Sequence, residues 1–190
     1  MSNKTAPGTI QIDDVRLAFP NLFKAAQVNG QGDPKYGASF IISDEGTVAA
    51  VNKVIEQAAL DKWGVKNGPT VLASLRKTDK VCLHAGDNKP YDGFAGNWYI
   101  STSAAGNARP GTFDKSGRPV TDEDGVLYAG CYVKALINIW AQDNQFGKRI
   151  NAQVRAVKFW REGDAFSGGR PAAASEFDDA EEGADAADFA

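Results

Sequence analysis

Two segments near the C-terminal end alternate between apolar and polar residues: GCYVKALINIW, residues 130–140, and INAQVRAVKFW, residues 150–160. Such alternation is typical of a β-strand with one buried and one solvated face, because successive strand side chains point to opposite sides of a sheet. Turn residues lie between the segments, at Asp143-Asn144 and Gly147. We therefore predict a long β-hairpin with a loop over residues 143–149, too long for a tight two-residue turn. The predicted buried faces hold Cys131, Val133, Ala135, Ile137 and Ile139 in the first strand and Ile150, Ala152, Val154 and Ala156 in the second.

The opposite face of this hairpin combines aromatic rings with cations. Tyr132 and Trp140 share the parity of Lys134, and further cations follow on the second strand. Flat rings among cations suit a single-stranded nucleic acid, because bases stack on the rings and the cations neutralise phosphates. Packing of both rings beneath another element is the alternative explanation. The predicted DNA contacts are Tyr132, Trp140 and, on another strand, Tyr99 as stacking rings, with Lys134, Lys148, Arg149, Arg155 and Lys158 at phosphates.

Length and composition limit the protein to a few classes. With 190 residues and 43% hydrophobic residues, the chain can bury one ordinary core, so we expect one globular domain over residues 1–166. No apolar run approaches the roughly 20 residues of a membrane span, and the N-terminal residues open no signal-like segment. We therefore expect an intracellular protein without membrane contact. Two cysteines and one histidine are too few for a disulfide scaffold or a zinc site without carboxylates, so no metal or cofactor is predicted.

The net charge of −3 is unevenly distributed along the chain. Residues 171–190 contain seven acidic residues and no Lys or Arg. Without them, 17 acidic residues face 21 cations, a net charge of about +4 on the remainder. Low apolar content and unbalanced charge predict a disordered acidic tail over residues 167–190. The remainder is basic enough to bind nucleic acid.

The rest of the chain predicts more strands and one helix. The strands cover residues 9–19, 36–42, 81–84 and 97–103, and a polar loop covers residues 29–34. The first strand is broken in phase at residues 13–14 and is expected to stop at Pro20. Apolar residues at helical spacing predict a helix over residues 44–63, with Ser43 as N-cap and Gly64 as its end. Residues 68–76 allow a second, short helix, and residues 104–125 are predicted to form a long exposed loop.

The sequence contains no recognisable catalytic constellation. It has neither the glycine-rich phosphate loop of NTPases nor the Gly-x-Ser-x-Gly turn of hydrolases. The acidic run at residues 122–125 does not have the spacing of a calcium loop. Cys82 and His84 lie two apart on a predicted strand, but no residue that would orient the histidine lies near them. No catalytic residue is therefore predicted.

These features favour a mainly β protein with one packed helix. A small barrel of five or six short strands with a helix over one end is the OB-fold, which binds oligonucleotides across its strand face and between its loops. A β-sandwich is the alternative architecture. Two other functions stay open at this point: a metal-dependent nuclease using carboxylates such as Asp13, Asp14 and Asp92, and a β-sandwich structural protein of a virion.

Several segments also match a known family in their order and spacing. They are residues 17–23 (LAFPNLF), 36–42 (YGASFII), Gly93 with 98–100 (WYI), 109–110 (RP), 128–133 (YAGCYV), and Asn144 with 147–150 (GKRI). In these segments the chain resembles the small single-stranded DNA-binding proteins of tailed bacteriophages, first catalogued as a domain of unknown function. The resemblance covers most of residues 8–166. It implies an OB-fold protein without catalysis that coats single strands during phage replication or recombination in the cytoplasm of the infected bacterial host.

The acidic tail extends the resemblance. Single-stranded DNA-binding proteins often carry an acidic C-terminus with an aromatic tip that replication or recombination partners recognise. The resemblance implies such a role for Glu181, Glu182, Asp185, Asp188 and Phe189. Here Phe189 is penultimate and Ala190 carries the carboxylate, which departs from the common form. We also predict that the carboxylates of the tail compete with DNA for the basic groove, because the tail is tethered close to that groove.

Overall fold

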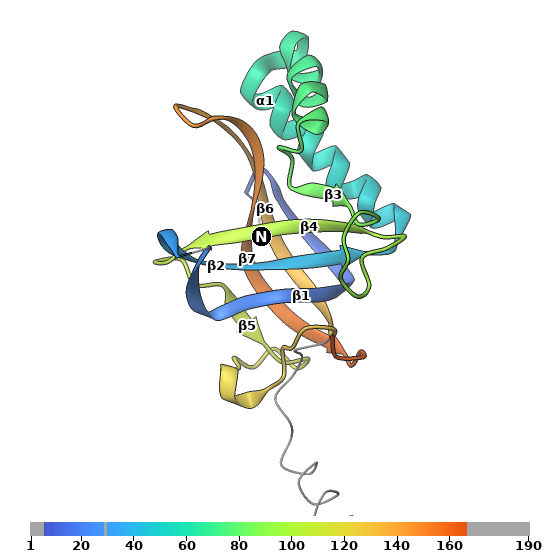
Figure 1. Ribbon diagram of the computed structural model, residues 1–190, viewed down its shortest axis with the longest axis vertical. Helices are drawn as coiled ribbons and strands as arrows, with labels where there is room; N and C mark the ends of the chain where they lie inside the picture. Colours follow the sequence, from blue (N-terminus) through green and yellow to red (C-terminus); the bar gives the residue numbers. More distant parts are fainter. Residues whose placement is uncertain (1–5, 29, 167–190) are drawn as a thin grey trace, which may run out of the picture.

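The computed structural model describes residues 6–28 and 30–166 (Figure 1). Within these residues the chain forms one sheet and one kinked helix. The elements are β1 (Thr9–Val28), β2 (Gln31–Ile42), α1 (Glu45–Lys77), β3 (Leu83–Ala85), β4 (Trp98–Ala105), β5 (Gly111–Phe113), the 3-10 helix η1 (Asp122–Asp124), β6 (Tyr132–Asn144) and β7 (Gly147–Arg161).

The sheet closes into a small barrel. Its strand order is β3-β4-β2-β1-β6-β7-β5, and β4 also pairs with β7 in parallel through Ser103 and Gln153. This extra pairing joins β1, β2, β4, β7 and β6 into a ring, which is the five-stranded arrangement of the OB-fold. The barrel confirms the predicted fold class and excludes the alternative β-sandwich.

The inner face of the β6–β7 hairpin forms much of the core. Cys131, Val133, Ala135 and Ile137 are fully buried, as their alternation predicts. In β7 the alternation shifts, because Leu136 pairs with Ala156 while Ile137 pairs with Val154. Arg155 is therefore the extra residue of a β-bulge. Beyond it Val157 is buried, so the prediction that Ala156 belongs to the buried face is wrong.

The hairpin turn is tighter than predicted. Asn144 pairs with Gly147, which leaves a two-residue turn in place of the loop over residues 143–149. Gly147 has a φ of 101°, and the Asn144 Oδ1 atom accepts a hydrogen bond from the Phe146 backbone N–H at 2.9 Å. The two strands continue through polar residues because they leave the barrel here as a solvated arm. Polar residues on both faces of an arm give no alternation by which the sequence could reveal a strand.

Strand β1 also runs further than predicted. The phase break at residues 13–14 is confirmed as a register shift between Ile12 and Val15. Pro20 does not end the strand, because pairing with β2 passes directly from Ala18 to Asn21. Pro20 therefore lies in a bulge, where its missing N–H is not needed. Val28 then pairs with Gln31, so β1 and β2 form a second arm where a polar loop over residues 29–34 was predicted.

The helix contains the predicted break. Gly64 has φ 84° and ψ 166° inside α1, which separates two helical halves. The first half ends where predicted, and the second is the short helix expected over residues 68–76. The N-cap is Asp44, one residue after the predicted Ser43, because the Asp44 carboxylate accepts a hydrogen bond from the Thr47 N–H at 2.8 Å. The two halves lie side by side, and Arg76 in the second donates to Asn52 in the first at 3.1 Å.

Helix α1 supports both the barrel and the β6–β7 arm. Val51, Ile55 and Leu72 are buried against the barrel core. The Trp63 indole Nε1 donates a hydrogen bond to an Asp143 carboxylate oxygen at 2.8 Å. This contact ties the arm to the helix. Among the described residues, no helix is both long and apolar enough to span a bilayer.

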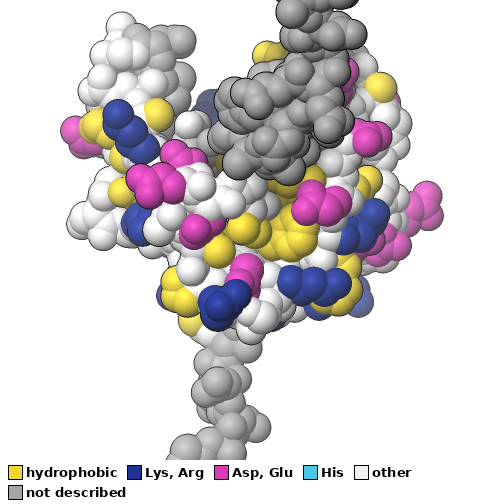
Figure 2. Space-filling view, turned by 90° about the horizontal axis from the view of Figure 1, so that it is seen from below, with side chains coloured by type: hydrophobic (Ala, Val, Ile, Leu, Met, Phe, Trp, Pro, Cys, Tyr) yellow, Lys and Arg dark blue, Asp and Glu magenta, His cyan; other side chains and the backbone are white. Residues whose placement is uncertain are grey.

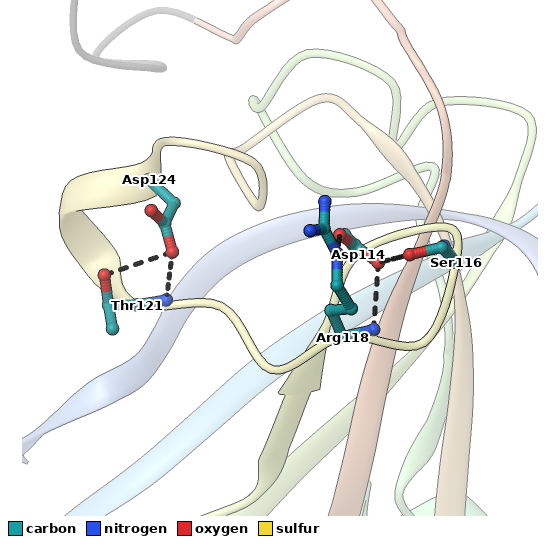
Figure 3. A network of polar contacts seen from close by, with 5 residues as sticks. All are labelled: Asp114, Ser116, Arg118, Thr121 and Asp124. Atoms are coloured by element: carbon teal, nitrogen blue, oxygen red, sulfur yellow. Dashed lines mark hydrogen bonds and ion pairs between the residues drawn. The ribbon is translucent and has the colours of Figure 1, made fainter.

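The segment over residues 104–125 has more structure than a long exposed loop. Its strand β5 pairs with β7, and the buried Thr112 hydroxyl donates to the Val120 carbonyl at 2.9 Å. The Asp114 carboxylate accepts hydrogen bonds from the Ser116 hydroxyl at 2.7 Å and the Arg118 N–H at 3.0 Å (Figure 3). These bonds, first of all that from Ser116, lower the pKa of Asp114 to about 2. Local polar contacts therefore fix this segment.

Candidate nucleic-acid interface

The β6–β7 arm rises beyond the barrel on the side of α1 (Figure 1). A cleft of about 560 Å³ lies between this arm and the ends of β2 and β4. Its lining includes Lys35, Ser103, Trp140, Gln142, Arg149 and Gln153. The barrel closes at this point, because Ser103 and Gln153 are the pair that joins β4 to β7. We call this the arm cleft.

Trp140 is the accessible ring of the arm cleft. Its side chain is 44% exposed, and its cross-strand partner on β7 is Asn151. The ring also borders a second cleft of about 450 Å³, which lies between β6 and α1 and is lined by Lys53 and Lys62. Trp140 is thus not packed beneath another element. A planar base can approach it from solvent.

Two cations of the arm cleft have no carboxylate partner. Within residues 6–28 and 30–166, neither Lys35 on β2 nor Arg149 on β7 forms an ion pair, and both are exposed. Lys148 lies 4.0 Å from the Asp143 carboxylate, a partly exposed pair of the kind that contributes little to stability. The amides of the cleft are already ordered, because the Asn151 Nδ2 donates to the Gln142 Oε1 at 2.8 Å. The arm cleft therefore offers one open ring, free positive charge and polar groups.

Tyr132 lies at the other end of β6. Trp140 is eight positions further along the chain, which is about 26 Å along a strand. The Arg161 guanidinium carbon stands 3.6 Å from the centre of the Tyr132 ring, and that of Arg16 stands 5.7 Å from it. Arg161 is also paired with Asp14 at 2.7 Å, and this hydrogen bond raises the pKa of Arg161. The structure thus places a cation of the chain itself on the ring that was predicted to stack on a base.

Two of the remaining predicted cations, Lys134 and Lys158, lie nearer to Tyr132 than to Trp140. Lys134 and Lys158 are half-buried and face each other across β6 and β7, and the Lys134 ammonium lies 4.1 Å from the centre of the Trp160 ring. Arg155 is exposed at the bulge between the two ends of the hairpin. On the lower end of the barrel, Lys and Arg side chains are interspersed with Asp and Glu on the visible part of the surface (Figure 2). The predicted contacts other than Tyr99 therefore separate into an arm group (Trp140, Lys148 and Arg149) and a barrel group (Tyr132, Lys134, Arg155 and Lys158).

Tyr99 is buried, which argues against its predicted stacking role. Its side chain is 7% exposed, and its ring lies 4.9 Å from that of His84 and 5.0 Å from that of Phe94. Tyr99 lies on the opposite face of β4 from Ile100, because strand side chains alternate. The segment between β3 and β4 then covers that face, which strand periodicity alone cannot reveal.

Sequence reasoning missed Lys35 and an exposed aromatic pair. Lys35 directly precedes the YGASFII segment. Its place at the start of this predicted strand was the only signal for it in the sequence. Phe19 and Tyr91 are half exposed, with ring centroids 4.8 Å apart. Phe19 belongs to the LAFPNLF segment, where an aromatic residue before a proline inside a strand was available as a signal.

The carboxylates of the nuclease alternative do not converge. Asp14 is held by Arg161, and among the described residues no group of three or more His, Cys, Asp or Glu side chains is placed to hold a metal ion. Cys82 and Cys131 are buried, and burial raises their pKa values to about 12 and about 11.

A family model described as "Enterobacter phage Enc34, ssDNA-binding protein" matches residues 8–189. The chain belongs to this family. "Putative protein p50" of Acyrthosiphon pisum secondary endosymbiont phage 1 is 42% identical over 173 residues, which cover 90% of this chain and 92% of that protein. The family predicted from the sequence segments is thereby confirmed.

Two solved structures show the same fold. One is the single-stranded DNA-binding protein of bacteriophage Enc34 in complex with ssDNA, with a TM-score of 0.65 and 23% identity over 84% of this chain and 89% of that chain. The other is gp2.5, a single-stranded DNA-binding protein of bacteriophage T7, with a TM-score of 0.54 and 12% identity over 84% of this chain and 95% of that chain.

The tail residues implied by the resemblance lie outside the described residues. They are Glu181, Glu182, Asp185, Asp188 and Phe189. The domain boundary at residue 166 likewise remains a prediction.

Proposed function

We propose that this protein binds single-stranded DNA of any sequence in the arm cleft, without catalysing a reaction. Its place of action would be the cytoplasm of the infected bacterium, during phage replication or recombination. The observation that carries the proposal is the open Trp140 ring beside the unpaired cations Lys35 and Arg149, in a member of a DNA-binding family. The ring and the cations supply the two interactions that single strands need.

The chemistry of the arm cleft favours binding without sequence preference. Every base has a flat face, so stacking on Trp140 contributes about 1–3 kcal/mol whatever the base. Lys35 and Arg149 would neutralise phosphates in the arm cleft, and Lys148, which pairs with Asp143 outside the cleft lining, would do so near the tip of the arm. Phosphates are the same in every sequence. Neither stacking nor phosphate neutralisation contacts a base edge, so neither interaction distinguishes one sequence from another.

The arm is held in place before DNA arrives. Trp63 in α1 binds Asp143 near the tip of the arm, and the Asn151–Gln142 hydrogen bond joins its two strands. Ordering a loop or side chain on binding lowers affinity, so a braced arm retains more of the contact energy. We propose that this bracing is the contribution of α1 to DNA binding.

The barrel group has a smaller part in this proposal. Lys134, Arg155 and Lys158 would attract the DNA backbone at longer range and raise the association rate. Tyr132 would stabilise the barrel through its contact with Arg161. Tyr99 is left out because it is buried.

The acidic tail would compete with DNA for the same cations. Residues 171–190 carry seven carboxylates on the same chain as a body whose net charge is about +4, so their effective concentration near the arm cleft is high. DNA would displace the tail, and Phe189 with its acidic neighbours would become available to a replication or recombination partner.

A salt-resolved titration tests the proposal. Quenching of Trp fluorescence by oligonucleotides of several sequences should give similar affinities, and each phosphate contact should add about 0.7 to the log-log slope against salt. Arg149→Ala should weaken binding to all sequences alike. Salt-insensitive affinity, or strong preference for one sequence, contradicts the proposal. Incubation of labelled single strands with magnesium tests the absence of nuclease activity.

A further inference from the structure

A second aromatic site lies on the barrel away from the arm cleft. Phe19 in β1 and Tyr91 in the segment between β3 and β4 are 52% and 51% exposed, and their rings meet edge to face at 79°. Both stand over Phe94, which is buried, with ring centroids 6.1 and 5.8 Å away. With Pro20, Asn21 and Phe166 they line a pocket of about 330 Å³.

Core packing does not account for the two exposed rings. Phe94 and Ile41 already cover the buried Tyr99, so the core beneath is complete without Phe19 and Tyr91. Phe19 has a φ of 47°, in the left-handed region that a bulky residue rarely adopts. Such strain concentrates at ligand-binding sites, where the surrounding structure holds a residue in an unfavourable conformation. Here the bulge around Pro20 keeps the Phe19 ring at the surface.

The outer face of β2 and β4 connects this pocket with the arm cleft. It carries small residues in cross-strand pairs, Ser39 with Ser101 and Gly37 with Ser103. Ser103 lines the arm cleft, and Ser39 also pairs with the β1 residue before Phe19. No large side chain of these pairs therefore interrupts the surface between the two sites, and three serine hydroxyls are available to donate hydrogen bonds to phosphates.

We propose that Phe19 and Tyr91 form a second base-stacking site, which a strand bound in the arm cleft reaches across the outer face of β2 and β4, the face on which OB-folds bind oligonucleotides. The inference rests on the proposed function and adds the residues that hold the strand at the far end of that face. A base would stack on an open ring face, while the Asn21 amide can donate to or accept from base edges. Asp92 also lines the pocket and repels phosphate, so the pocket takes a base while the backbone passes outside it.

The test compares oligothymidines of increasing length, from about 4 to 16 nucleotides, the range of site sizes for OB-folds. The variant is Phe19→Asn with Tyr91→Ser. Asn tolerates positive φ, so the first change removes the ring and relieves the backbone. Trp98→Leu is the matched control, because Trp98 is 44% exposed on β4 and borders a different cleft, beside Arg76 and His84. Thermal unfolding confirms that each variant is folded.

The proposed path makes the loss depend on length. The double variant should bind long oligothymidines about tenfold more weakly. It should bind the shortest ones, which fill only the arm cleft, like the wild type, and Trp98→Leu should match the wild type at all lengths. Unchanged affinity at every length, an equal loss at every length, or the same loss in Trp98→Leu overturns the second site. Failure of the wild type to bind any oligothymidine refutes the proposed function itself. If Trp140→Ala weakens binding and the double variant does not, the proposed function stands and only the second site is refuted.

Discussion

Trp140 and Tyr132 occupy the same face of the same strand, yet their surroundings differ. Trp140 lies where β6 leaves the barrel, and its ring is open beside unpaired cations. Tyr132 lies where β6 begins, and its ring carries Arg161, which is itself paired with Asp14. The comparison shows that an aromatic residue next to cations predicts DNA binding only if those cations do not already stack on the ring.

The largest expected difference between the two ends is in DNA affinity. Trp140→Ala should weaken single-strand binding by about 1–3 kcal/mol, because one stacked base is lost. Tyr132→Leu should leave affinity nearly unchanged, because its ring is occupied by Arg161. Fluorescence anisotropy with a labelled oligonucleotide measures both. Equal losses in the two variants would show that the two ends of the hairpin bind DNA alike.

Removal of the tail should change the DNA affinity of the arm cleft. Deletion of residues 171–190 should tighten single-strand binding several-fold at low salt, because seven competing carboxylates are lost. The gain should disappear near 1 M salt, where the screening length falls to about 3 Å. The same deletion should abolish recruitment of a partner without unfolding the domain. A truncated protein that binds no more tightly at low salt refutes the competition.

The cations at the two ends should differ in salt dependence. Arg149→Ala should lower the log-log slope against salt by about 0.7, because it removes one phosphate contact. Lys134→Ala should change the slope less, since its ammonium lies against Trp160 and faces Lys158. Both variants remove one positive charge, so each is the control for the other. The reverse order of slopes would place the DNA backbone on the barrel group.

The smallest effect concerns stability at the barrel end. Arg161→Ala removes an exposed ion pair and a cation–π contact, both of which are weak because solvent screens them. The free energy of unfolding should therefore fall only slightly, with DNA affinity little changed. Urea denaturation and the anisotropy assay separate the two effects. A large loss of affinity with unchanged stability would assign Arg161 to DNA.

Much of the barrel could be predicted because apolar and polar residues alternate along its core strands. The buried face of β6, the phase break before Val15 and the helix break at Gly64 each follow from a local pattern. The two arms could not be predicted, because polar residues on both faces of a strand look like a loop. The β-bulge at Arg155 could not be predicted for a similar reason, since one inserted residue shifts the alternation without any turn residue beside it.

The candidate site was less predictable because it depends on contacts between distant segments. The sequence could place Trp140, Lys148 and Arg149 close to one another, since they belong to one hairpin, and two of them, Trp140 and Arg149, line the arm cleft. Lys35 comes from another strand, and only closure of the barrel brings it to the arm cleft. The burial of Tyr99 could not be predicted for the same reason, because Phe94 from a separate segment covers it. Strand periodicity gives the face of a residue but not what covers that face.

Photocrosslinking to a single strand containing 5-iodouracil tests most directly where DNA lies. Adducts mapped by mass spectrometry should fall on Trp140 in the arm cleft, and Tyr132, which lies beneath Arg161, should stay unmodified. Truncation of the tail should raise the yield at low salt without moving the adduct. Adducts on Tyr132 in place of Trp140 would contradict the assignment of DNA binding to the arm cleft.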